Sequence, residues 1–184
     1  MALTFTPQDG LGQSLPSFQL KGMDEKIHSE KEFQNANALL VMFICNHCPY
    51  VLAVEDRLIQ LGHELKKMSI PVVAICSNDP AEYPEDNFAN LKKRSSEKEF
   101  PFVYLHDPDQ AVAKKFGAVC TPDFFVYDKK NQLAYRGRLD DSWKDASKVQ
   151  KRELFNAIQD IAAGKPAPTQ QTPSMGCNIK WSLS

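Results

Sequence analysis

The chain lacks the features that mark several large classes of protein. It has 22 Lys and Arg against 23 Asp and Glu, and it has no large basic block, so a nucleic-acid partner is not indicated. No stretch is long and apolar enough to span a bilayer. Residues 1–10 contain neither the basic start nor the apolar segment of a secretory signal. We therefore expect a cytoplasmic protein that has no membrane partner.

Cysteine is also sparse, and the number of cysteines is odd. The five are Cys45, Cys48, Cys76, Cys120 and Cys177. In a chain without an export signal, this count argues for free thiols or a catalytic pair and against a structural disulfide framework. Zinc normally takes four ligands, and the sequence has no second CxxC motif and no spaced pair of histidines to complete such a site.

What the sequence does contain is the motif Cys45-Asn46-His47-Cys48 between an apolar strand and an amphipathic helix. Residues 38–44 are apolar without interruption, which is typical of a strand buried on both faces. Residues 51–65 carry apolar side chains at helical spacing. Unpaired N–H groups and the macrodipole at a helix start stabilise a thiolate. We therefore expect Cys45 to be a nucleophile of low pKa and Cys48 to be its disulfide partner.

The rest of the chain alternates between strand and helix signals. We expect a hairpin over 16–29, a strand over 70–76 parallel to the strand at 38–44, a helix over about 84–95, a strand over 102–105, a helix between Asp107 and Gly117, a hairpin over 124–136, and a last helix capped by Ser147 that ends near Gly164. No internal repeat or second core is evident. One domain is therefore expected over residues 1–164, followed by a tail over residues 165–184 that is linker-like as far as Cys177.

This order of elements, with Thr121-Pro122 just before a strand, resembles the thioredoxin fold. In that fold the X–Pro bond is cis and lies against the redox cysteines, where an exposed backbone edge binds an extended substrate. The resemblance therefore implies that Thr121 and Pro122 bind substrate. It also has limits, because the strand before Cys45 lacks the buried acidic residue that assists proton transfer in thioredoxins.

Several motifs are similar to those of bacterial thioredoxin-like redoxins in the AhpC/TSA branch of the superfamily. They are residues 45–50 (CNHCPY), 83–86 (YPED), 118–125 (AVCTPDFF), 135–137 (YRG) and 176–181 (GCNIKW). The resemblance covers almost the whole chain. It implies an α/β, thioredoxin-like fold with an N-terminal hairpin and a redoxin-type insertion over residues 77–99. It implies no bound organic cofactor.

Three further residues are candidates for the same site. His47 resembles the histidine of oxidising members of the fold, where a partly protonated imidazole would favour the Cys45 thiolate and raise the reduction potential. Its alternative is a solvent-exposed helix residue. Cys120, two residues before Pro122, is either a small residue that fills space or an accessory thiol. Cys177 is either a resolving or relay thiol or a residue docked with Trp181.

The sequence favours a thiol–disulfide oxidoreductase, in which Cys45 attacks a substrate disulfide and Cys48 resolves the mixed disulfide. Its partners would be a disulfide-containing protein or a small-molecule thiol or disulfide, with thioredoxin or glutathione as the electron source. One alternative is a thiol peroxidase with Cys45 as the peroxidatic residue, although Met42 stands where peroxiredoxins place a threonine. Another is a copper or zinc carrier that uses Cys45, His47 and Cys48 with Cys120 or Cys177.

Overall fold

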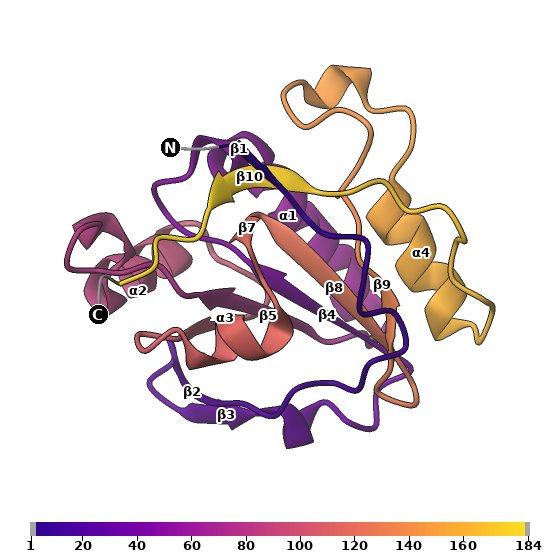
Figure 1. The fold of residues 1–184 in the computed structure, drawn as a ribbon, viewed down its shortest axis with the longest axis horizontal. Coiled ribbons are helices and arrows are strands. Elements are labelled where there is room, and N and C mark those ends of the chain that lie inside the picture. The colour runs from indigo at the N-terminus through magenta and orange to yellow at the C-terminus, as the bar shows by residue number, and fades with distance from the viewer. Residues whose placement is uncertain (1–2, 183–184) are drawn as a thin grey trace.

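The computed structural model describes residues 3–182 and is built on a seven-stranded sheet with helices on both faces (Figure 1). The strand order is β3-β2-β6-β5-β4-β8-β9. The three central parallel strands are β4 (Ala38–Phe43), β5 (Val72–Cys76) and β6 (Val103–His106). The antiparallel strands are β8 (Asp123–Asp128) and β9 (Leu133–Tyr135) on one side and β2 (Gln19–Gly22) and β3 (Ile27–Ser29) on the other. Both predicted hairpins are therefore confirmed.

Strand β4 is buried on both faces, as its uninterrupted apolar sequence predicts. Leu40 and Met42 lie in the core layer shared with α1 (Pro49–Lys67) and α4 (Glu153–Ala162). Val41 and Phe43 lie in the opposite layer, shared with α3 (Ala111–Phe116). The strand thus directs the CxxC motif to the carboxyl edge of the sheet, where α1 begins.

The insertion after β5 is helical, as expected from the sequence. A short 3₁₀ helix, η2 (Pro84–Asp86), leads into α2 (Phe88–Glu97), and another, η1 (Glu30–Glu32), follows β3. Within residues 3–182, no helix combines the length and the hydropathy that crossing a bilayer requires.

The starts of two helices differ from prediction because side chains form local turns. Ser147 does not cap α4. It lies in the 3₁₀ helix η3 (Ala146–Lys148), where its hydroxyl and backbone N–H both donate to Asp145. Asp107 precedes α3 by more than one residue, and Gln110 is the N-cap with a left-handed φ of 62°. The Asp107 carboxylate nevertheless accepts from two backbone N–H groups of the first turn, 3.2 and 2.9 Å away.

The C-terminal segment, expected to be linker-like as far as Cys177, forms a strand. β10 (Met175–Asn178) lies between β1 (Leu3–Phe5) and β7 (Cys120–Thr121) in a second, three-stranded sheet (Figure 1). Beyond it, Lys180 donates its backbone N–H to the Asn78 side chain (2.9 Å). The residues after β10 are thus held on the domain, near the insertion.

Candidate active site

The helix after the CxxC motif starts at Cys48 and not at Cys45, the residue whose pKa the helix start was expected to lower. α1 begins at Pro49, and Cys48 is its N-cap residue with extended backbone angles. Proline suits the first position of a helix because its φ is fixed and its missing N–H is not needed there. Cys45 therefore lies in the loop between β4 and the helix. Both cysteines are buried, with exposed fractions of 3% for Cys45 and none for Cys48.

The two thiols of the motif contact each other beneath Thr121. They form a hydrogen bond with one another. The Sγ of Cys45 lies 3.4 Å from the hydroxyl of Thr121, and the Sγ of Cys48 lies 3.2 Å from the Thr121 carbonyl oxygen. The Thr121-Pro122 peptide bond is cis, as the resemblance implied.

The pKa values of the two thiols are ordered opposite to the prediction, with Cys48 lower than Cys45. The hydrogen bond from Cys45 lowers the pKa of Cys48 although burial opposes this effect. Burial raises the pKa of Cys45, and the hydrogen bond to Cys48 and the charge of Asp86 add to the increase. The prediction that the helix start gives Cys45 the low pKa is therefore wrong for the reduced protein. Of the two thiols, Cys48 therefore has the lower pKa and Cys45 the higher.

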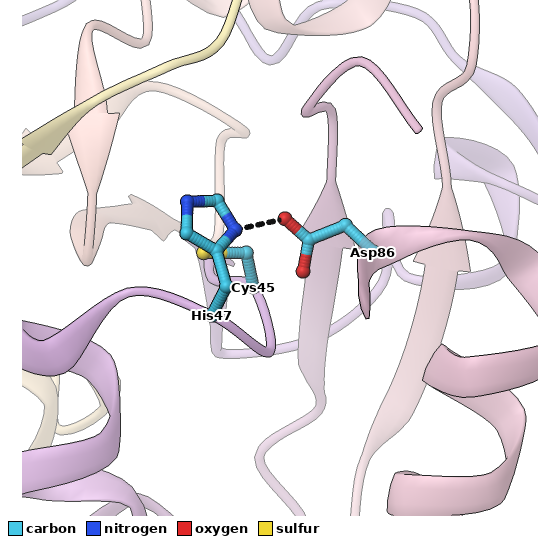
Figure 2. Close-up of side chains that lie close together, drawn as sticks. All are labelled: Cys45, His47 and Asp86. Carbon is cyan, nitrogen blue, oxygen red and sulfur yellow. Dashed lines mark hydrogen bonds and ion pairs between the residues drawn. The ribbon is translucent and has the colours of Figure 1, made fainter. Parts of the chain in front are cut away.

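His47 is held against the insertion by a buried carboxylate (Figure 2). Its Nδ1 lies 2.6 Å from Oδ2 of Asp86, and its ring stacks on Tyr83 with centroids 4.6 Å apart. Asp86 is fully buried and also accepts from the backbone N–H of Asn46 (2.7 Å) and the side chain of Asn78 (2.8 Å). The alternative of a solvent-exposed His47 is wrong, because only 10% of its side chain is exposed.

Asp86 is the residue of the site to which the sequence assigned no role. It lies within the motif at residues 83–86, but an acidic residue in a polar insertion gives no signal of burial. Its position beside Cys45 supplies a carboxylate that β4, with its sequence ALLVMF, does not carry. Its place within the motif at residues 83–86 was the available clue.

Three side chains could hold a metal ion. Cys45, His47 and Asp86 each offer one donor atom, and these atoms lie within 4.8 Å of one another. The Nε2 atom of His47 is buried and has no hydrogen-bond partner among the described residues. A sulfur, nitrogen and oxygen set of this kind suits zinc. It differs from the predicted set, since Asp86 takes part while Cys48 does not.

The candidate accessory thiols lie in different surroundings. Cys177, on β10, is 2% exposed and forms a hydrogen bond with Cys48, and burial is the main reason that its pKa is raised to about 12. Cys120 is fully buried, its Sγ lies 3.6 Å from the Pro122 carbonyl oxygen, and burial raises its pKa. The structure thus brings Cys177, from the opposite end of the sequence, into contact with the CxxC motif.

The substrate edge expected at Thr121-Pro122 is occupied by the chain itself. β10 pairs antiparallel with β7, with Cys177 opposite Thr121 and Asn178 opposite Cys120. The expectation of an open edge is therefore wrong for this conformation. A cleft of about 140 Å³ lies next to it, lined in part by Tyr50, Pro122 and Trp143. The Trp143 ring, 37% exposed, lies 4.5 Å from the ring of Tyr50 at this cleft.

A CxxC motif at the start of the helix that follows a central strand, facing a cis-proline, defines a thioredoxin-fold protein. The AhpC/TSA family model matches residues 11–136, and the chain belongs to this family. The predicted fold and the resemblance to the AhpC/TSA branch are confirmed. Family membership supports a thiol redox function. No curated protein matches the sequence.

Two solved structures are similar to this chain over its whole length. An uncharacterized conserved protein from Geobacillus kaustophilus is 37% identical with a TM-score of 0.94, and the match covers 100% of this chain and 98% of that one. A hypothetical protein from Sinorhizobium meliloti 1021 is 36% identical with a TM-score of 0.93, over 98% and 100% of the two chains. The thioredoxin domain of a thiol-disulfide oxidoreductase from Bacteroides vulgatus, 13% identical with a TM-score of 0.63 over 83% and 97%, shares the fold.

Proposed function

We propose that this protein is a thiol–disulfide oxidoreductase whose redox pair is Cys45 and Cys48. The observation that carries the proposal is the hydrogen bond between the two thiols at the start of α1, beneath Thr121. A thiolate attacks a disulfide sulfur directly, so exchange needs a nucleophile and a neighbouring thiol and no further cofactor. Both are present in one contact.

The shared proton gives the order of steps. As the sulfur of Cys45 attacks one sulfur of a client disulfide, its proton passes to Cys48 through their hydrogen bond. The client S–S bond breaks, its second sulfur leaves as a thiolate, and a mixed disulfide with Cys45 remains. Cys48 then loses its proton and attacks the Cys45 sulfur, the bond between Cys45 and the first client sulfur breaks, and that client sulfur leaves as a thiolate. The client gains two electrons, and the enzyme ends with a Cys45–Cys48 disulfide.

His47, held by Asp86, is the side chain beside the redox pair that can take up a proton. Asp86 holds Nδ1, which leaves Nε2 as the nitrogen with no partner among residues 3–182. In the neutral ring whose Nδ1 carries the hydrogen, Nε2 is an acceptor. Asp86 is therefore a positioning residue that sets the tautomer, and it leaves Nε2 of His47 able to accept a proton.

The surroundings of the pair favour one kind of client. The cleft beside Pro122, with the rings of Tyr50 and Trp143, suits an apolar side chain of a client polypeptide. We propose disulfide-containing polypeptides as clients. A cellular thiol system, thioredoxin or glutathione, would return electrons to the oxidised pair.

Catalytic insulin reduction with dithiothreitol tests the proposal. Wild type is expected to accelerate it, Cys45→Ser to abolish the effect, and Cys48→Ser to accumulate mixed disulfides with insulin. Cys76→Ala, which removes a buried thiol of β5, is the matched control and is expected to remain active. A wild-type rate equal to that of dithiothreitol alone would refute the proposal.

The same proteins test the peroxidase alternative with hydrogen peroxide. The two arginines that follow β9 are engaged elsewhere, Arg136 with Asp123 (3.2 Å) and Arg138 with Glu153 (2.5 Å). Stabilising charge on a departing oxygen needs donors positioned at the thiol. Peroxide consumption is therefore expected to match that of an ordinary thiol. Saturable, Cys45-dependent turnover of peroxide would favour the peroxidase.

A second candidate function is metal carriage, favoured by the three donors at Cys45, His47 and Asp86. Wild type, after incubation with zinc and gel filtration, would then retain one equivalent of zinc, and Asp86→Ala would retain none. Glu85→Gln, which changes the exposed neighbour, is the control. If neither wild type nor Glu85→Gln retains zinc, this function is excluded.

A further inference from the structure

The strand β10 lies where an extended substrate would pair in a thioredoxin fold. It bonds to β7 on one side, and β1 covers its other edge, so Thr121 already has a strand partner (Figure 1). The residue of β10 opposite Thr121 is a cysteine, Cys177. The chain thus presents its own thiol at the position of a substrate sulfur.

β10 lies so close to the cis-proline loop that position 176 has no room for a side chain. A Cβ atom added to Gly176 would lie 1.9 Å from the carbonyl oxygen of Thr121 and 3.1 Å from the nitrogen of Pro122. Ser174, just before the strand, donates its hydroxyl to the Pro122 carbonyl oxygen at 2.9 Å. Glycine is therefore required for this docking, which sets the position of the next residue, Cys177.

The segment after β10 is anchored as well. The side chain of Gln110 donates to the Lys180 carbonyl oxygen at 2.7 Å and accepts the backbone N–H of Ser182 at 2.8 Å. Contacts on both sides of Cys177 thus fix it on the domain. Its thiol forms a hydrogen bond with Cys48, which also forms one with Cys45. Cys48 is therefore the central member of three buried thiols.

We propose that Cys177 is a third redox thiol and that β10 is an internal exchange partner of the Cys45–Cys48 pair. This proposal rests on the proposed function. After a client has been reduced, the sulfur of Cys177 loses its proton and attacks Cys48. The Cys45–Cys48 bond breaks, a Cys48–Cys177 bond forms, and Cys45 leaves as a thiolate that takes up a proton. No net electrons are exchanged in this step, which moves the disulfide away from Cys45 and onto Cys177.

An external dithiol completes the cycle by reducing the Cys48–Cys177 disulfide. It supplies two electrons and two protons and leaves as a disulfide itself. Oxidising equivalents would therefore pass from the client through Cys45 and Cys48 to Cys177. The client reacts at one end of the thiol series and the reductant at the other.

Disulfide mapping in a variant that cannot form the first disulfide tests the connection. Cys45→Ser, oxidised with diamide and digested without reduction, is expected to yield a peptide joined through Cys48 and Cys177. The double variant Cys45→Ser/Gly176→Ala is expected to lose most of this product because β10 is displaced. Cys45→Ser/Cys120→Ser is the matched control and is expected to retain it. Absence of the joined peptide in Cys45→Ser would overturn the proposal.

Turnover separates this proposal from the proposed function. With one equivalent of insulin and no reductant, Cys177→Ser is expected to reduce the substrate as fast as wild type. With excess insulin and a thioredoxin system, its steady-state rate is expected to fall. Equal steady-state rates would overturn the role of Cys177 while insulin reduction itself stands. If neither wild type nor Cys177→Ser reduces insulin, the proposed oxidoreductase function itself is refuted.

Discussion

Replacement of Asp86 by alanine is expected to destabilise the protein more than any surface change nearby. Its carboxylate is fully buried and accepts hydrogen bonds from Asn46, His47 and Asn78 at 2.6 to 2.8 Å. Alanine removes the acceptor and leaves these donors without it. The backbone after Cys45, the imidazole and the end of β5 would lose their common anchor.

The magnitude follows from the three orphaned donors. Each buried donor left without an acceptor costs about 1–3 kcal/mol. Since Asn46 and His47 are only partly buried, water can satisfy part of the loss, and a total of about 3–5 kcal/mol is expected, the range found for broken buried charge pairs. That is a large fraction of the roughly 5–15 kcal/mol by which a typical domain is stable.

Urea unfolding of the reduced protein at pH 7 measures this loss. Glu85→Gln is the control because it removes a carboxylate from the adjacent, exposed position of η2, and it is expected to change the free energy of unfolding by less than about 0.5 kcal/mol. Asp86→Asn keeps the volume but offers one acceptor in place of two, so an intermediate loss is expected. A loss below about 1 kcal/mol in Asp86→Ala would refute the reasoning, because it would mean that the donors find other partners.

Three further results are expected. Although the pKa of Cys48 is the lower of the two, iodoacetamide should alkylate Cys45 first in the reduced protein, because Cys48 has no exposed surface and Cys45 retains 3%; labelling of Cys48 first, detected by mass spectrometry of partly alkylated protein, would contradict this expectation. His47→Ala should move the reduction potential to more negative values by roughly 20–40 mV, equivalent to about 1–2 kcal/mol, measured against a glutathione series; an unchanged potential would remove His47 from the mechanism. Burial raises the pKa of Asp123 to about 6. This lies above the unfolded value of about 3.9, so the folded state binds the proton of Asp123 more tightly than the unfolded state does. The protonated Asp123 therefore adds about 3 kcal/mol to the free energy of unfolding at low pH, and this amount should be lost as pH rises from about 4 to about 6. Thermal unfolding of wild type and Asp123→Asn across this range should differ in slope, and parallel profiles would contradict the assignment.

The elements that the sequence predicted well are those specified by neighbouring residues. An uninterrupted apolar run requires β4 to be buried on both faces, and helical spacing after the CxxC motif requires α1. The start of α1 was misassigned because Pro49 fixes the first helical position and shifts the N-cap to Cys48. The order of the two thiol pKa values instead follows from the burial of Cys45 and from its hydrogen bond to Cys48.

The features that the sequence did not predict depend on contacts between distant residues. Nothing in Met175–Asn178 alternates between polar and apolar side chains in a way that signals a strand. Its pairing with β1 and β7 joins the two ends of the chain to the cis-proline loop. The burial of Asp86 likewise depends on Asn46 and Asn78, from other segments. Such pairings are encoded by complementary surfaces, which local patterns do not reveal.

The two additions to the thioredoxin core supply what its central strand lacks. β4 carries no ionisable side chain, and the insertion compensates by bringing the Asp86 carboxylate to His47 and Cys45. The C-terminal strand brings the Cys177 thiol to Cys48 from the other side of the motif. Grafting residues 45–48 onto another thioredoxin-fold protein would transfer the two cysteines and the histidine without these groups. Thiol chemistry in this protein therefore depends on three segments of chain, of which the CxxC motif is only one.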